Sequence, residues 1–177
     1  MAKEIKCDNT SVGVIARDDL GRILLIERKK FPFGWAPPSG HCDGKFYPVA
    51  CFNEFEEETG LRVVGAPKPL IPKNSRKRFK CRRGGQYHDW QIFEVNWRGE
   101  LRPSQDETKN AKWHTLAEIC ELAEKTRNYI GRMRALSNPA IPSSAANSTM
   151  EVLENEWQSN PGLEPVWYEF FQELKII

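Results

Sequence analysis

The sequence predicts a mixed α/β domain followed by a helical C-terminal segment. Apolar runs of strand length occur near the N-terminus, and residues 89–97 alternate polar and apolar side chains as a half-buried strand does. A helix is predicted to open near Pro48 and to stop at Gly60. Apolar residues recur at helical spacing over 118–136 and again over 164–174. The length of 177 residues and the apolar content of 40% suit one domain with an appendage.

The predicted strands begin close to the N-terminus. Residues 11–16 form an apolar run typical of a buried strand, and residues 22–28 form a second run that ends in charge. Between them, residues 18–21 end in a glycine and predict a turn. Two strands joined by such a turn predict a β-hairpin.

The segment 53–61 is the most informative part of the chain because four carboxylates crowd the last predicted turn of a helix. A helix C-terminus favours cations, and like charges three or four residues apart repel by roughly 0.2–0.5 kcal/mol per pair. Glu54, Glu57 and Glu58 share one face of this helix. Three carboxylates on one face suit a hard divalent cation such as Mg2+ or Mn2+. The structural alternative is a solvated acidic face with an ordinary glycine cap.

The Pro- and Gly-rich loop 35–45 leads directly into this helix. Loop and helix together resemble the Nudix box, a Gly followed by five residues, Glu, seven residues, and Arg-Glu-apolar-x-Glu-Glu-x-Gly-apolar. Gly40 opens the box. Its second half is filled by Glu54, Phe55, Glu57, Glu58, Gly60 and Leu61. The chain departs from the pattern in a loop one residue short, in Lys45 where the first acid is expected, and in Asn53 where the Arg is expected.

The resemblance implies the Nudix fold, an α/β/α sandwich around a mixed β-sheet, with an added C-terminal helical segment. We expect the Nudix domain to occupy residues 1–137. A Pro-, Ser- and Ala-rich linker is predicted at 138–148, and a helical extension at 149–177. The last helix carries a bulky stripe that includes Trp167 and Phe170. This stripe is expected to pack on the domain's own core, and the alternative is a homodimer contact.

The resemblance also implies an activity, a divalent-metal-dependent pyrophosphohydrolase. The substrate would be a nucleoside diphosphate linked to another moiety, such as ADP-ribose or a nucleoside triphosphate. The implied cofactor is Mg2+ or Mn2+, bound by the carboxylates of Glu54, Glu57 and Glu58. The backbone carbonyl of Gly40 would complete the protein's ligand set. The general base would be Glu57 or Glu58 in the helix, or an acid in the loop before the closing strand, where Asp106 and Glu107 are candidates and Glu107 is preferred.

Five residues outside the metal set are candidates for contact with substrate. Arg28, Phe33 and Trp35 belong to a basic and aromatic patch next to the box loop, which borders the substrate cleft in Nudix enzymes. Lys45 cannot bind metal when it is protonated, but it could contact a phosphate. His88 is a candidate from the segment before the strand at 89–97. The structural alternative for the aromatic residues is packing beneath the loop.

The basic run 73–83 has three interpretations. It could be a solvated hairpin rim, an element that holds the substrate's pyrophosphate, or an RNA-binding strip. The alternative function depends partly on it: a catalytically weak or inactive Nudix domain that binds nucleotide or RNA as a regulatory module. Lys45, Asn53 and the shortened loop also favour that alternative. A small nucleotide derivative is nevertheless the expected partner, because one basic run alone does not make a nucleic-acid groove.

The five cysteines are scattered and form no CxxC pair, which indicates reduced thiols rather than a disulfide framework. A zinc site built from Cys7, Cys81 and His88 is conceivable, although isolated cysteines are more often small core residues. The sequence shows neither a signal-peptide pattern nor an apolar run long enough to span a membrane. We therefore expect a cytoplasmic protein, and the net charge of +2 predicts no particular partner.

Overall fold

The computed structural model describes residues 6–71, 75–139 and 142–177. Its helices are α1 (Tyr47–Thr59), α2 (Leu116–Leu136), α3 (Ser143–Ser159) and α4 (Pro165–Glu173). Its strands are β1 (Thr10–Ala16), β2 (Ile23–Arg28), β3 (Trp35–Ala36), β4 (Ser39–His41), β5 (Arg62–Pro69), β6 (Ser75–Lys77), β7 (His88–Arg98) and β8 (Thr108–His114). Helices and strands therefore mix along the chain as the sequence predicts.

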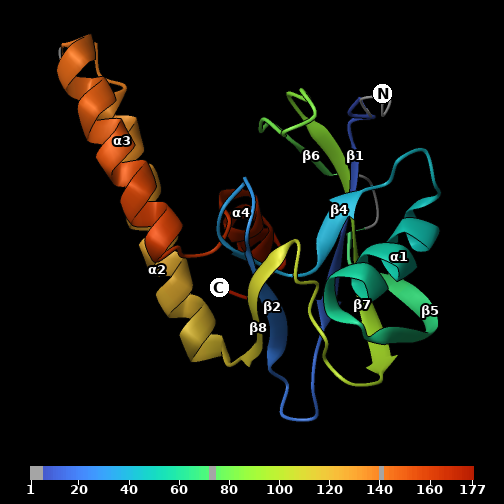
Figure 1. The fold of residues 1–177 in the computed structure, drawn as a ribbon. Coiled ribbons are helices and arrows are strands. Elements are labelled where there is room, and N and C mark those ends of the chain that lie inside the picture. The colour runs from blue at the N-terminus through green and yellow to red at the C-terminus, as the bar shows by residue number, and fades with distance from the viewer. Residues whose placement is uncertain (1–5, 72–74, 140–141) are drawn as a thin grey trace.

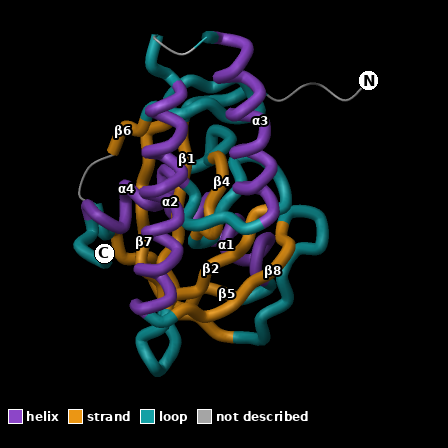
Figure 2. Tube along the Cα trace, turned by 90° about the vertical axis from the view of Figure 1, so that its left-hand side faces the viewer, coloured by secondary structure: helices purple, strands orange, loops and turns teal. Residues whose placement is uncertain are grey.

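The strands form two sheets, with helices on both sides (Figure 1). The larger sheet has the order β4-β1-β7-β5, and β6 also pairs with β7. Within it β1 and β7 are parallel, whereas the other pairs are antiparallel. The smaller sheet, β3-β2-β8, is antiparallel. Figure 2 looks onto α2 and α3, which run in front of the strands. The predicted fold class, helices packed around a mixed sheet, is confirmed.

The predicted hairpin between residues 11–16 and 22–28 is wrong. These segments become β1 and β2, which lie in different sheets and share only an isolated bridge between Arg17 and Ile23. The reason is that β1 already pairs with β4 along one edge and β7 along the other, whereas β2 pairs with β3 and β8. The turn was predicted correctly, but it joins two sheets.

The central strand β1 of the larger sheet is buried on both faces. Val12 and Val14 of β1 belong to a hydrophobic cluster with Phe55 of α1. Ile15 belongs to a second cluster, which contains side chains of α2 and α4, including Trp167. Alternating side chains of a strand point to opposite faces, so an apolar run such as β1 fits a strand covered on both sides.

The helix ends follow local sequence rules. Gly60 terminates α1 in the left-handed conformation, with φ of 73°, and its N–H donates to the carbonyl of Glu56 at 2.8 Å. At the start of α2, Thr115 and Glu118 form a reciprocal capping box. Both helices therefore begin and end within two residues of the bounds predicted from the sequence.

The C-terminal segment differs from the prediction in one respect. Helix α3 begins at Ser143, inside the segment predicted as a linker, so the connection after α2 is shorter than 138–148. Helix α4 is part of the core, because Trp167 is fully buried and packs on β1. A Cβ atom added to Gly13 would lie 2.4 Å from the Trp167 indole, so this contact requires a glycine in β1. No helix in the described parts of the chain is long and apolar enough to cross a membrane.

Candidate active site

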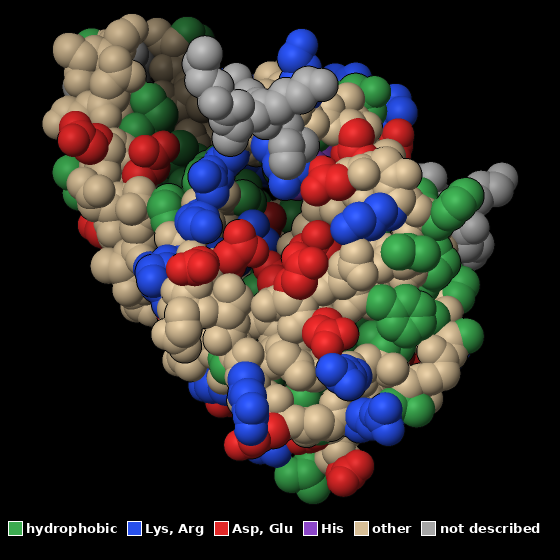
Figure 3. Space-filling view, turned by 45° about the vertical axis from the view of Figure 1, so that its right-hand side comes forward, with side chains coloured by type: hydrophobic (Ala, Val, Ile, Leu, Met, Phe, Trp, Pro, Cys, Tyr) green, Lys and Arg blue, Asp and Glu red, His purple; other side chains and the backbone are tan. Residues whose placement is uncertain are grey.

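The acidic residues predicted to bind metal line one cavity of about 470 Å³. Glu54, Glu57 and Glu58 reach it from α1, and Glu107 reaches it from the loop before β8. Figure 3 shows Asp and Glu side chains gathered beside Lys and Arg side chains around a hollow on one face. The neighbouring acid Asp106 does not line this cavity. The structure therefore brings the predicted metal ligands and the predicted loop acid together.

The backbone at Gly40 lies directly against one of these carboxylates. A Cβ atom added to Gly40 would lie 2.0 Å from Oε2 of Glu54, so any larger residue at position 40 would displace the carboxylate from this position. Burial, and then repulsion from the carboxylates of Glu57 and Glu107, raise the pKa of Glu54 to about 7. The box glycine thus makes space for a side chain that binds its proton unusually tightly.

Glu58 is oriented by contacts that the sequence did not predict. The N–H of Ser39 donates to its Oε2 at 2.7 Å, and Arg28 Nη1 lies 4.0 Å from its Oε1. Burial raises the pKa of Glu58 to about 8, with the Arg28 charge acting in the opposite direction. Where the family pattern expects an arginine, Asn53 is half-buried. Arg28 and Ser39 therefore orient the Glu58 carboxylate although the box lacks its arginine.

Glu164 is a cavity residue that sequence reasoning missed. It precedes α4, is only 3% exposed, and its Oε2 lies 3.6 Å from Nε of Arg28. Burial raises its pKa to about 7, although Arg28 opposes this shift. The N–H of Glu164 donates to the carbonyl of Trp35 at 2.9 Å, which anchors the start of α4 beside the box loop. Only a tertiary contact between distant segments identifies this residue.

The residues present fit a hard divalent cation. The donor set consists of carboxylate oxygens and backbone carbonyls, which are the ligands that Mg2+ and Mn2+ prefer. Glu54 and Glu58 both have raised pKa values because they are buried together with further carboxylates. A bound divalent cation would favour their ionised forms, since an opposite charge stabilises a carboxylate.

Basic side chains also line the cavity, some of them next to its acids. Arg28, Lys30, Arg82 and Arg83 all line it. Two other described members of the basic run form ion pairs: Arg76 forms a paired salt bridge with Asp89, and Lys77 pairs with acids of α4. The predicted run is thus divided between ion pairs and the cavity, and Lys73 lies outside the described residues.

Three of the predicted substrate contacts lie away from this cavity. Trp35 is buried in the core, with its ring 4.8 Å from the His114 ring. Lys45 is exposed in the loop before α1 and does not line the cavity. His88 is completely buried, and burial followed by the charge of His41 lowers its pKa to about 4. Trp35 and His88 are packed as aromatic side chains usually are.

Phe33 lines a neighbouring cavity of about 270 Å³. This second cavity shares Phe31, Pro32, Phe79 and Glu164 with the acidic one. Its other aromatic residues, Tyr129 of α2 and Trp157 of α3, stack with centroids 4.3 Å apart. Trp157 also donates from its indole nitrogen to the carbonyl of Phe33 at 3.0 Å. An aromatic compartment therefore adjoins the acidic one, and α2 and α3 form part of its wall.

Comparison with known proteins supports the assignment that the site suggests. A family model described as NUDIX domain matches residues 8–135. The chain belongs to the Nudix family. It is therefore a hydrolase that acts on phosphoric anhydride bonds, and enzymes of this family generally use divalent metals. No curated protein sequence matches the chain.

Solved structures support the Nudix fold. The MutT protein from Methanosarcina mazei Go1 is 20% identical, with a TM-score of 0.53 over 66% of this chain and 83% of that one. The MutT NUDIX hydrolase from Burkholderia pseudomallei is 25% identical, with a TM-score of 0.52 over 62% of this chain and 84% of that one. At 20% identity, the likeness to the Methanosarcina mazei protein concerns the fold alone. The Nudix box of this chain thus contributes four residues to the cavity wall: Gly40, Glu54, Glu57 and Glu58.

Proposed function

We propose that this Nudix protein is a divalent-metal-dependent pyrophosphohydrolase. Its substrate would be a nucleoside diphosphate linked to another moiety, a nucleotide sugar such as ADP-ribose or a nucleoside triphosphate. The observation that carries the proposal is one cavity lined both by the α1 carboxylates and by Arg28, Arg82 and Arg83. Carboxylates that bind a cation and cations that bind phosphate are both needed to hold a metal–diphosphate complex.

The cofactor in this proposal is Mg2+ or Mn2+, held by the carbonyl of Gly40 and the carboxylates of Glu54, Glu57 and Glu58. When bound, such a cation neutralises phosphate oxygens and lowers the pKa of a coordinated water. Glu58 accepts a hydrogen bond from the Ser39 N–H, so this ligand is oriented before substrate arrives, and Glu54 lies close to the Gly40 backbone. Ordered ligands reduce the cost of reaching the reactive geometry.

The general base is proposed among Glu57, Glu58 and Glu107. Glu58 is engaged by Ser39 and is next to Arg28, which favours an orienting role. Glu107 is 53% exposed, lies 3.5 Å from Lys30, and lines the cavity from outside α1. A carboxylate outside the metal-ligand set can take a proton from a water molecule while the three α1 carboxylates remain available to the metal. We therefore favour Glu107 as the base.

The remaining part of the substrate is proposed to enter the aromatic cavity. Phe33, Tyr129 and Trp157 offer ring faces and edges beside the acidic cavity, and Lys80 also lines this compartment. Flat aromatic groups such as nucleobases stack on rings of this kind. Because residues of α2, α3 and Glu164 belong to these walls, the helices after residue 115 contribute to substrate binding rather than forming a separate module.

The proposal is tested by chromatographic product analysis on nucleoside triphosphates, nucleotide sugars and dinucleoside polyphosphates. Each compound is incubated with Mg2+, with Mn2+ and with chelator. We expect metal-dependent cleavage that falls by at least about 100-fold in Glu57→Gln. Glu56→Gln is the matched control, because Glu56 is on the same helix but pairs with Arg62 at the surface. Binding without turnover on every compound would instead support a regulatory nucleotide-binding module.

A further inference from the structure

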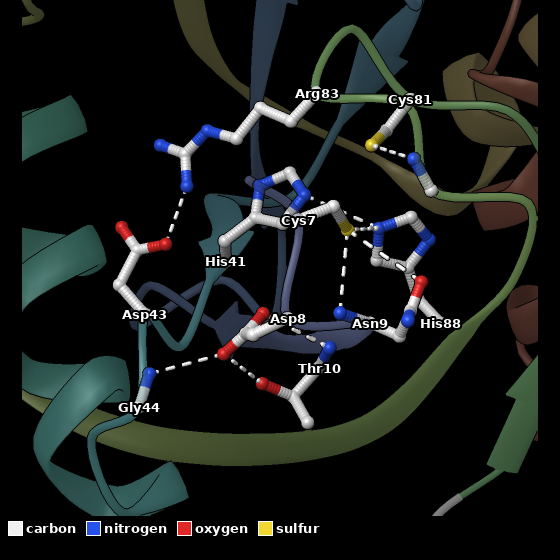
Figure 4. Close-up of polar contacts among 11 residues, drawn as sticks. Cys7, Asp8, Asn9, Thr10, His41, Asp43, Gly44, Cys81, Arg83 and His88 are labelled. Carbon is white, nitrogen blue, oxygen red and sulfur yellow. Dashed lines mark hydrogen bonds and ion pairs between the residues drawn. The ribbon is translucent and has the colours of Figure 1, made fainter. Parts of the chain in front are cut away.

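Two thiols and two imidazoles from four separate segments converge next to the acidic cavity (Figure 4). Cys7 precedes β1, His41 ends β4, Cys81 lies in the loop between β6 and β7, and His88 begins β7. Their ligating atoms all lie within 4.8 Å of one another. We propose that these four side chains bind a zinc ion in a tetrahedral site, distinct from the catalytic metal site.

The distances among the ligating atoms agree with a zinc site. Bonds of about 2.3 Å to sulfur and about 2.0–2.1 Å to nitrogen place neighbouring ligand atoms about 3.3–3.8 Å apart around a tetrahedral ion. Cys7 Sγ lies 3.1 Å from His88 Nε2, which in turn lies 3.2 Å from His41 Nε2. Only small adjustments are therefore needed for a shared ion. His88 Nε2 thus lies close both to the other imidazole nitrogen and to the thiol. Each of these atoms can bind a metal ion through a lone pair when it carries no proton.

Backbone N–H groups support both sulfur atoms. The N–H of Asn9 donates to Cys7 Sγ at 3.3 Å, and the N–H of Gly85 donates to Cys81 Sγ at 3.3 Å. Hydrogen bonds of this kind stabilise a thiolate, which is the form of cysteine that binds metals. The backbone at Gly85 passes so close that an added Cβ would lie 2.5 Å from Cys7 Sγ and 3.1 Å from Cys81 Sγ. Both sulfur atoms are thus held in place by the chain around them.

The histidines are also restrained. His88 is completely buried, and its ring stacks on Phe79 with centroids 4.6 Å apart. His41 is fixed by the pairing of β4 with β1, opposite Ser11. Thiolate and imidazole ligands in a tetrahedral arrangement favour zinc, whereas the carboxylates of α1 favour a hard cation such as Mg2+. The two neighbouring sites should therefore not compete for the same ion.

A zinc ion here would connect the N-terminal segment, β4 and the loop between β6 and β7. That loop carries Arg82 and Arg83 to the cavity, and His41 directly follows Gly40. The ion pair between Arg83 and Asp43 also attaches this loop to the segment that follows β4. The ion would thus act structurally, by fixing the basic side of the cavity relative to the box glycine.

The test measures zinc in the full-length reduced chain, with any affinity tag removed, by elemental mass spectrometry. We expect about one zinc ion per chain. Cobalt substitution should give the visible absorption of a tetrahedral site together with thiolate-to-metal charge transfer. Cys81→Ser should lose the zinc and the charge-transfer band. Cys120→Ser, which changes an exposed thiol outside the cluster, should retain both.

The catalytic site provides a second control, because Glu57→Gln should retain the zinc while it loses turnover. Zinc retained in Cys81→Ser but lost in Glu57→Gln would place the ion at the carboxylates and overturn the proposal. Two results with the wild-type protein would also overturn the proposal. One is the absence of both zinc and thiolate–cobalt absorption, and the other is a Cys7–Cys81 disulfide in place of bound metal. The wild-type measurements decide the question even if a variant does not fold. Their outcome is independent of turnover.

Discussion

Replacing Glu164 by Gln isolates the free-energy cost of one buried carboxyl group. Glu164 is 3% exposed, and within the described residues its Oε2 has no hydrogen-bond partner. Burial raises its pKa from 4.5 to about 7, while the charge of Arg28, 3.6 Å away, opposes the shift. Glutamine has nearly the same shape but no proton to release. The substitution therefore removes the titration while it keeps the packing.

The sign of the effect follows from proton binding. Between pH 4.5 and about 7 the folded protein keeps a proton on Glu164 that the unfolded chain releases. Stability linked to this group is therefore present in acid and is lost as the pH rises through about 7. With these two pKa values, the cost to folding is about 1 kcal/mol at pH 5 and about 3 kcal/mol at pH 8. The variant should thus gain about 2 kcal/mol relative to the wild type across this range.

The assay is urea denaturation of both proteins at about pH 5 and about pH 8, in chelator without divalent cations. Glu169→Gln is the control, because Glu169 lies in α4, which Glu164 directly precedes, but its side chain is 59% exposed. The control should change stability equally at both pH values. If the Glu164→Gln difference stayed constant, or became less favourable at the higher pH, the argument from burial would be refuted.

Two other substitutions test the site and the core. Gly40→Ala places a Cβ 2.0 Å from Oε2 of Glu54, so displacement of the carboxylate should lower metal-dependent turnover by about 100-fold in steady-state kinetics. Gly131→Ala is the control, because a Cβ at that position has open space. Unchanged turnover would show that the close contact at Gly40 is unimportant. Trp167→Ala removes a fully buried indole between β1 and α4 and should lower the free energy of unfolding by about 3–5 kcal/mol in urea denaturation. A loss below about 1 kcal/mol would mean that α4 is not part of the cooperative core.

Local features were predicted well from the sequence. The ends of α1 and α2 depend on residues within one turn, such as Gly60 and the pair Thr115 and Glu118, so local rules suffice. The hairpin prediction failed because strand partners are chosen across the whole chain, and β1 already pairs with β4 and β7. The predicted linker failed at Ser143 because its small residues are compatible with a helix once α3 packs against α2.

The sequence by itself determined which carboxylates share a helix face, because Glu54, Glu57 and Glu58 are related by helical spacing alone. Tertiary structure decided which residues join them. Glu164 lies more than a hundred positions from α1, and His41 meets Cys7 and Cys81 only after β1, β4 and β7 have paired. Helical spacing acts within one turn, whereas packing is set by the burial of the whole core. For that reason the acidic face could be predicted from the sequence, but the buried Arg28–Glu164 pair and the complete thiol–imidazole cluster could not.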